Sequence, residues 1–279
     1  FNVAANYVLI FGHWGFPALG VVGSGWSTSI SRGAMMLMIG LAAWPILAPY
    51  LRTFRRAVLH PSTYVDLVRL GLPIAVQVSL EIWVFATVAL MMGNLGAREL
   101  AAHQIALTLS ALTFMVPMGI AGAATTRVGN AIGREDADGA RRAAAVGLGL
   151  GAGVMSISAI VFATFPALLA RLFTPEVGVV VMAASLLPIA AVFQVFDGLQ
   201  VVGAGVLRGA ADTRVPAAFA FVGYWLLGLP LGVLLTYRLD FGPAGLWWGL
   251  TLGLGATAML FLLRIRTTFR GQLKRFGSE

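Results

Sequence analysis

The chain has 279 residues, of which 59% are hydrophobic and only 11% charged, and it carries a formal net charge of +8. With a mean hydropathy of +0.88, this composition excludes a soluble globular domain and is typical of a polytopic membrane protein. The sequence contains no cysteine, which excludes a disulfide framework and thiolate metal sites.

The chain begins with an apolar segment, residues 1–11, that is too short to cross a bilayer. It has no initiator methionine, basic region or cleavage site, so we interpret it as the end of a truncated span rather than a signal peptide. A turn region at 12–20 leads into a long apolar helix that ends near Tyr50 and contains Arg32. A guanidinium at membrane depth faces a cavity, pairs with an acid or extends to the interface, and the sequence leaves these alternatives open.

A basic linker follows at residues 51–70, with arginines on both sides of Pro61. Its apolar residues form a stripe that predicts an amphipathic helix lying along the membrane surface.

The next segment, residues 71–93, measures roughly 34 Å as a helix, which is enough to cross a bilayer. Its single charge, Glu81, lies halfway along it. An ionised carboxylate at that depth costs about 2.5 to 3.5 kcal/mol, so such a residue usually faces a cavity and is functional. We expect Gln77, one turn earlier, to line the same cavity. The alternative is a protonated Glu81 that hydrogen-bonds to a neighbouring helix.

Five further spans follow by hydropathy, at 100–126, 143–170, 177–207, 215–237 and 245–263. The glycine-rich stretch 147–153 lies inside the second of these. No strand precedes it, so its glycines at four-residue spacing predict close helix packing and not a dinucleotide-binding loop.

The basic residues divide unevenly between the two sides of this topology. One side holds fifteen: Arg52, Arg55, Arg56, Arg69, Arg127, Arg134, Arg141, Arg142, Arg208, Arg214, Arg264, Arg266, Arg270, Lys274 and Arg275. The other holds only Arg98, Arg171 and Arg238. The positive-inside rule makes the first side cytoplasmic. The net positive charge therefore faces anionic membrane lipid, which argues against nucleic-acid binding.

A second acid, Asp197, falls within a predicted span. Gln194 and Gln200 lie three residues before and after it and share its helix face, and Phe193 flanks them. This polar stripe predicts a cavity lining, so Asp197 and Glu81 are expected to face one chamber. The alternative for Asp197 is an interhelical hydrogen bond to a Ser, Thr or Tyr.

No other group matches a catalytic or metal site. His13, His60 and His103 lie on different segments and form no ligand cluster. His103 is better explained as a packed or interfacial residue than as a proton relay.

Three stretches, 101–144, 196–214 and 224–232, resemble motifs of multidrug and toxic compound extrusion (MATE) transporters. The resemblance implies twelve helices in two six-helix lobes, and export of cationic amphipathic drugs in exchange for Na⁺ or H⁺. Residues 71–263 would then be the complete second lobe and 1–50 the last two helices of the first. Residues 51–70 would be a cytoplasmic linker and 264–279 a basic cytoplasmic tail.

The same resemblance implies roles for individual residues. The family's membrane carboxylates match Glu81 and Asp197, whereas Phe193 stands where some relatives have a tyrosine. Asn2 and Asn6 match the paired asparagines of the polar cavity in the first lobe.

The sequence therefore predicts an all-α polytopic transmembrane bundle, part of a cation-coupled multidrug antiporter of a bacterial inner membrane. It is not expected to be an enzyme or to need a cofactor other than the coupling ion, and the sequence implies no particular oligomeric state. One alternative is a lipid-linked saccharide flippase, which would carry basic residues in its cavity, where Arg32 is the sole candidate. Another is an intramembrane glycosyl- or acyltransferase, but Glu135, Asp136 and Asp138 alternate with arginines, as in a solvated loop.

Overall fold

The computed structural model describes residues 1–52 and 61–270, which are almost entirely helical. Seven helices in these residues are long and apolar enough to cross a membrane, which confirms the predicted all-α polytopic class. The chain forms two compact units, Phe1–Tyr64 and Val65–Glu279.

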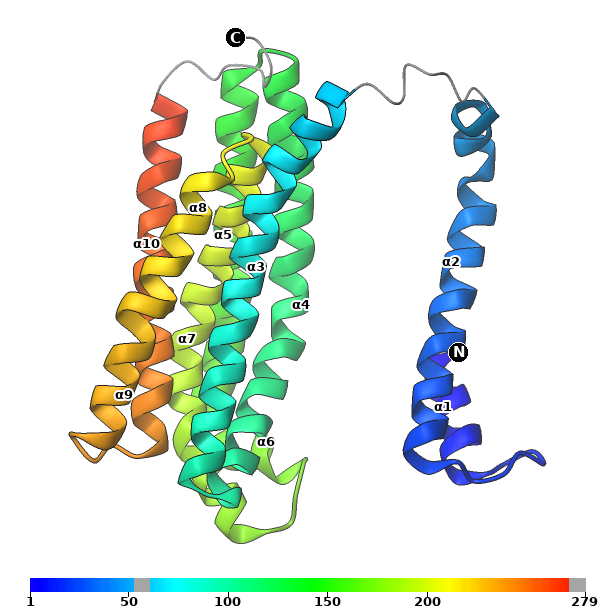
Figure 1. Cartoon of the computed structure of the whole chain (residues 1–279). Coiled ribbons are helices and arrows are strands. Elements are labelled where there is room, and N and C mark those ends of the chain that lie inside the picture. The colour runs from blue at the N-terminus through cyan, green and yellow to red at the C-terminus, as the bar shows by residue number, and fades with distance from the viewer. Residues whose placement is uncertain (53–60, 271–279) are drawn as a thin grey trace. The chain divides into compact units, whose positions relative to one another are not determined.

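The first unit is a hairpin of α1 (Asn2–Phe11) and α2 (Gly20–Arg52) (Figure 1). α1 ends at Gly12, whose φ of 75° is left-handed, and a Cβ on Gly12 would lie 2.7 Å from the backbone nitrogen of Ala18. Only glycine fits such a turn without strain. Gly23 of α2 in turn lies against the carbonyl group of Leu9, so the two helices touch backbone to backbone.

The second unit is a bundle of six membrane-spanning segments (Figure 1). In chain order its elements are α3 (Pro61–Leu95), α4 (Ala97–Gly133), α5 (Ala137–Thr164), α6 (Pro166–Arg171), α7 (Val177–Gly209), α8 (Arg214–Ala220), the π-helix η2 (Phe221–Gly228), α9 (Leu229–Tyr237) and α10 (Pro243–Arg270). α7 is the central helix, since it packs against α4, α5, α6 and α10.

Helix bounds differ from the predicted spans where charge or proline is involved. α3 begins at Pro61, so residues 61–70 of the predicted surface linker belong to the same helix as the predicted span 71–93. Residues 53–60 of that linker lie outside the described residues. The predicted span 143–170 is wrong as a single helix: it breaks at Phe165, and Pro166 starts α6 at a position where proline needs no N–H partner. α10 extends to Arg270, and the rest of the predicted tail is outside the described residues.

The predicted close packing of the glycine stretch holds for one pair of glycines. A Cβ on Gly147 would lie 3.2 Å from that of Ala124 on α4, and one on Gly151 would lie 3.2 Å from the carbonyl oxygen of Gly198 on α7. Gly149 and Gly153 have nothing within 4 Å and take no part in it.

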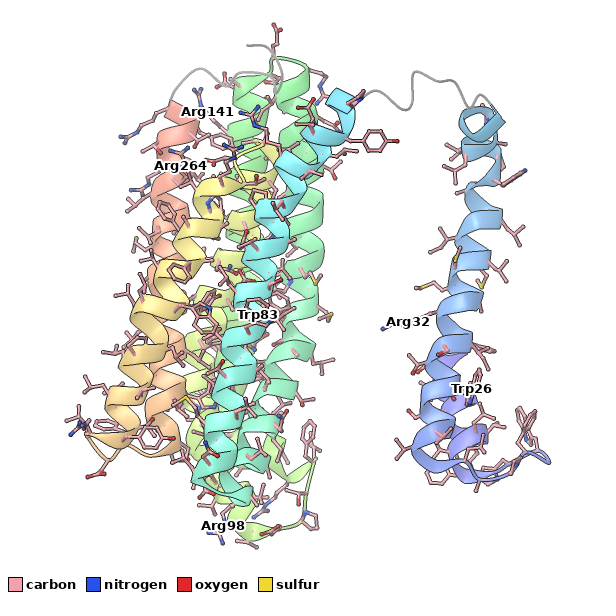
Figure 2. All side chains as sticks on the ribbon, viewed as in Figure 1. Trp26, Arg32, Trp83, Arg98, Arg141 and Arg264 are labelled. Atoms are coloured by element: carbon pink, nitrogen blue, oxygen red, sulfur yellow. The ribbon has the colours of Figure 1, made fainter. Side chains whose placement is uncertain are left out.

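Arginines mark the two ends of the six-helix bundle. Figure 2 shows Arg141 and Arg264 at one end and Arg98 at the other. Arg264 Nε pairs with Asp212 Oδ2 at 2.6 Å, which ties the α7–α8 connection to α10. Arg141 Nε donates to the carbonyl oxygen of Phe269 at 3.0 Å and ties the start of α5 to the end of α10.

Candidate functional site

Glu81 lies on α3 and is held by two glutamine side chains. Gln77 Nε2, one turn earlier, donates to Glu81 Oε1 at 3.1 Å, and Gln200 Nε2 of α7 donates to the same oxygen at 2.7 Å. Both glutamines are buried. Among the described residues, no donor reaches Glu81 Oε2. The two glutamines therefore fix the carboxylate through Oε1 and leave Oε2 available to a ligand.

Asp197 lies on α7 three residues before Gln200, so both side chains project from the same face of that helix. Asp197 is 8% exposed, and its charge interacts with that of Glu81. No hydrogen bond or ion pair from the described part of the chain reaches its carboxylate. A buried carboxylate without a protein partner is costly unless a proton or a cation neutralises it.

Glu81 and Asp197 line the same cavity, which has a volume of about 620 Å³ and is walled by α3, α4, α7 and η2. Phe193 and Gln200 line it as well. The remaining wall is largely apolar, with residues such as Ile82, Phe85, Phe114, Met118 and Val201. A cavity of this size, with a few polar groups in an apolar wall, suits a small organic molecule.

Two of the residues expected in the cavity lining lie behind it. Gln77 is bound to Glu81, and Gln194 donates a hydrogen bond to Thr113 Oγ1 of α4. Gln77 therefore acts on the cavity through Glu81, whereas Gln194 joins α7 to α4 outside the cavity lining.

Phe193 belongs to a row of aromatic rings. It meets Phe85 edge to face, with ring centroids 6.1 Å apart, and meets Trp247 in the same way at 5.9 Å. Trp247 in turn packs on His103 at 5.7 Å. His103 is completely buried, and neither ring nitrogen has a hydrogen-bond partner in the described chain, as the packed-residue interpretation expects.

The sequence interpretation missed most residues of the cavity wall, among them the ionisable Arg208 and Tyr224. Arg208 follows Asp197 by eleven residues, just over three helical turns, so both lie on one face of α7. Its charge interacts with that of Glu81, and its buried Nε has no hydrogen-bond partner among the described residues. The eleven-residue spacing from Asp197 is the sequence signal that could have predicted Arg208 in the cavity. Tyr224 is buried in η2, whose apolar sequence carries no such signal.

The predicted polar pair of the first unit also forms a cluster. Asn6 Nδ2 donates to Asn2 Oδ1 at 2.9 Å, and Asn2 Nδ2 donates to Ser31 Oγ of α2 at 3.1 Å. The neighbouring Arg32 is exposed and extends away from α2 (Figure 2). Asn2 and Asn6 thus form a hydrogen-bonded group within the first unit, while Glu81 and Asp197 share the cavity of the second.

The charges in the cavity suit a monovalent cation. Two carboxylates and one guanidinium line it, a net charge of −1 when all three are ionised. The described residues contain no group of three or more His, Cys, Asp or Glu side chains that could hold a metal ion. A pair of carboxylates is a type of group that can accept a proton or an alkali cation.

Comparison with known proteins places this cavity in a family context. A family model described as MatE matches residues 73–234, more than half of the chain, and this range includes every residue that lines the cavity. The chain is 41% identical over 272 residues to the "Probable multidrug resistance protein NorM" of Mesorhizobium japonicum. It is 42% identical over 274 residues to the protein of the same name from Xanthomonas campestris pv. campestris.

These matches cover 94% and 95% of this chain but only 58% of each relative. Among solved structures, the crystal structure of the eukaryotic MATE transporter AtDTX14 is similar, with a TM-score of 0.79 at 25% identity. That alignment covers 98% of this chain and 60% of the transporter. The chain thus spans little more than half the length of these relatives. The seven apolar helices of the described residues and the bacterial relatives make it an integral protein of the inner membrane.

Proposed function

Because the chain belongs to the MatE family, we propose that it is part of an antiporter that exports cationic amphipathic compounds in exchange for Na⁺ or H⁺. The observation that carries the proposal is the presence of Glu81 and Asp197 in one largely apolar cavity. The names of the bacterial relatives, multidrug resistance proteins, support drug-like compounds as the substrate class.

The geometry supports an exchange in which the coupling ion and the drug compete for the same negative charge. A cationic drug places its charge at the carboxylates and its apolar body against the wall formed by residues such as Phe114 and Met118. A proton or Na⁺ that binds Glu81 and Asp197 removes that attraction. If the ion binds the outward-releasing conformation more tightly, it shifts the population toward drug release, and the coupling is reciprocal.

The alternatives fit the structure less well. A flippase that holds a pyrophosphate needs a positive cavity, whereas Glu81, Asp197 and Arg208 give a net negative one. A transferase needs free acidic ligands for a metal, but Asp136 accepts a hydrogen bond from Gly139 N at 2.7 Å, and Asp138 pairs with Arg141 at 2.9 Å. Members of the family are in general transporters and not enzymes.

The proposal is tested in liposomes that contain the full-length antiporter, with export of a cationic dye driven by an imposed Na⁺ or H⁺ gradient. We expect Glu81→Gln to abolish gradient-driven export while the purified protein keeps its helix content and elution profile. Glu99→Gln is the matched control, because Glu99 lies in the first turn of α4 and does not line the cavity. Export at the wild-type rate by Glu81→Gln would refute the role of this carboxylate.

A further inference from the structure

A second cavity, of about 470 Å³, lies between α4 and α5 near the turn that joins them. The two helices pack side by side (Figure 1). This groove shares no lining residue with the cavity of Glu81 and Asp197. Helix α4 borders both, but with a different face.

On α4 the groove follows one helix face. Ile120, Ala124, Arg127 and Ala131 line it together with Arg134, the residue that follows α4, and successive members are three or four residues apart. The stripe is apolar at its start and ends in two arginines.

On α5 the order is reversed, because the helix runs back from the turn. Arg142 comes first, followed along the same face by Ala143, Val146, Gly147 and Leu150. The arginines of both helices therefore gather at the turn, and the apolar residues of both lie farther along the bundle.

Small side chains make the space between these helices. A Cβ on Gly147 would lie 3.2 Å from that of Ala124, so the floor of the groove is a close contact of the two helices. Ala131 and Ala143 leave room above this floor. On the rim, Val146 is 60% exposed and Leu150 is 54% exposed, as expected for side chains that contact lipid.

The three arginines of the groove are exposed and take part in neither ion pair of the described residues, since those pairs use Arg141 and Arg264. The one carboxylate in the groove, Asp136, caps the start of α5 by accepting from Gly139 N. Arg127, Arg134 and Arg142 with Asp136 leave a net charge of +2.

We propose that this groove binds an anionic phospholipid of the cytoplasmic leaflet, with its phosphate at Arg127, Arg134 and Arg142 and an acyl chain along Val146 and Leu150. Guanidinium groups bind phosphate oxygens with paired, charge-assisted hydrogen bonds. Basic pockets between membrane helices at the cytoplasmic side are suited to anionic head groups. The apolar continuation into the membrane favours a lipid over a soluble phosphate, which has nothing to place there.

The test is native mass spectrometry of the full-length protein in detergent, titrated with phosphatidylglycerol or with phosphatidylcholine of the same acyl chains. We expect phosphatidylglycerol to bind more tightly. The variant Arg127→Gln/Arg134→Gln/Arg142→Gln should bind it on the order of five-fold more weakly for each arginine removed. The matched control Arg98→Gln/Arg171→Gln/Arg238→Gln removes as many charges outside the groove and should bind as the wild type does.

A second pair of variants tests the acyl groove and keeps all the arginines. Ala123→Leu places a larger side chain in the groove and should weaken phosphatidylglycerol binding, whereas Ala145→Leu, at an exposed position outside the groove, should not. Equal binding of the two lipids, or an unchanged affinity in the triple arginine variant, would overturn the proposal. Displacement of the lipid by millimolar inorganic phosphate, with no effect of Ala123→Leu, would show a soluble-anion site instead.

Discussion

Arg208 adds a positive charge to the cavity that Glu81 and Asp197 line, and in the proposed cation site we expect this charge to set how strongly a cation is held. Its charge interacts with that of Glu81, and it lines the same cavity as Asp197. With Arg208 present, one monovalent cation neutralises the three groups. A cavity with only the two acids would hold that cation more tightly and release it more slowly.

We therefore expect Arg208→Gln in the full-length antiporter to lower the ion concentration needed for half-maximal export and to lower the maximal rate. The loss of one neighbouring charge should change the apparent ion affinity about 5- to 30-fold, equivalent to roughly 1–2 kcal/mol. Arg208→Lys keeps the charge and should stay close to wild type. An unchanged ion dependence in Arg208→Gln would show that this guanidinium does not act on the carboxylates.

The residue-scale features that the sequence predicted are those with a strong local signal. Glu81 and Asp197 are charges inside apolar spans, and helical spacing joins Gln200 to Asp197. Arg208 escaped prediction because a charge at the end of a span counts as a loop residue under the positive-inside rule. For Gln194 the spacing correctly predicts the helix face that it shares with Asp197. The spacing cannot predict that its side chain donates to Thr113 on another helix.

At the scale of the elements, α7 and α4 approach each other closely at a glycine. Thr125 Oγ1 of α4 donates to the carbonyl oxygen of Gly205 on α7 at 2.8 Å. A Cβ on Gly205 would lie 2.6 Å from the carbonyl oxygen of Ala121. Backbone atoms cannot move aside as a flexible side chain does, so a larger residue here separates the helices that carry the cavity.

We expect Gly205→Ala to destabilise the folded protein by about 1–3 kcal/mol, the usual cost of overpacking, and to lower its melting temperature in detergent. Gly203→Ala is the matched control on the same helix, because the nearest atom to its Cβ would be Phe261 Cβ at 3.4 Å, an ordinary contact. Equal melting temperatures for the two variants would contradict the close-packing interpretation.

Hydropathy predicted which elements exist but not their internal form. It located every span of the six-helix unit, because an apolar run of sufficient length is a strong signal. It ended the last span at Leu263, before Arg264, whereas α10 continues through these charged residues to Arg270. It also missed η2, where the backbone hydrogen-bond pattern widens to that of a π-helix, a feature that is frequent at functional sites. Trp225 of η2 donates to the carbonyl oxygen of Leu80 at 3.2 Å and so links this segment to α3 beside Glu81.

At the scale of the whole molecule, the ends of the six-helix bundle differ in charge, with Arg141 and Arg264 at one end and Arg98 at the other (Figure 2). The positive-inside rule predicts that the first end is cytoplasmic. Single cysteines at Ala97 and Ala137 test this orientation, in a background from which any other cysteine has been removed. A membrane-impermeant thiol reagent added outside intact cells should label Ala97→Cys but not Ala137→Cys. Labelling of both from the same side would contradict the orientation.

The central claim is that Glu81 and Asp197 form one cation site and not two. Glu81→Gln and Asp197→Asn each keep the side-chain shape and remove one charge. Groups that act as a unit are not additive, because the first substitution already destroys what the second would remove. The decisive measurement is a double-mutant cycle on ion-driven drug export by the full-length antiporter in liposomes. We expect each single variant to lose coupled export and the double variant to be no worse than either. Partial losses whose free energies add in the double variant would contradict this expectation, since they would place the two carboxylates in separate sites.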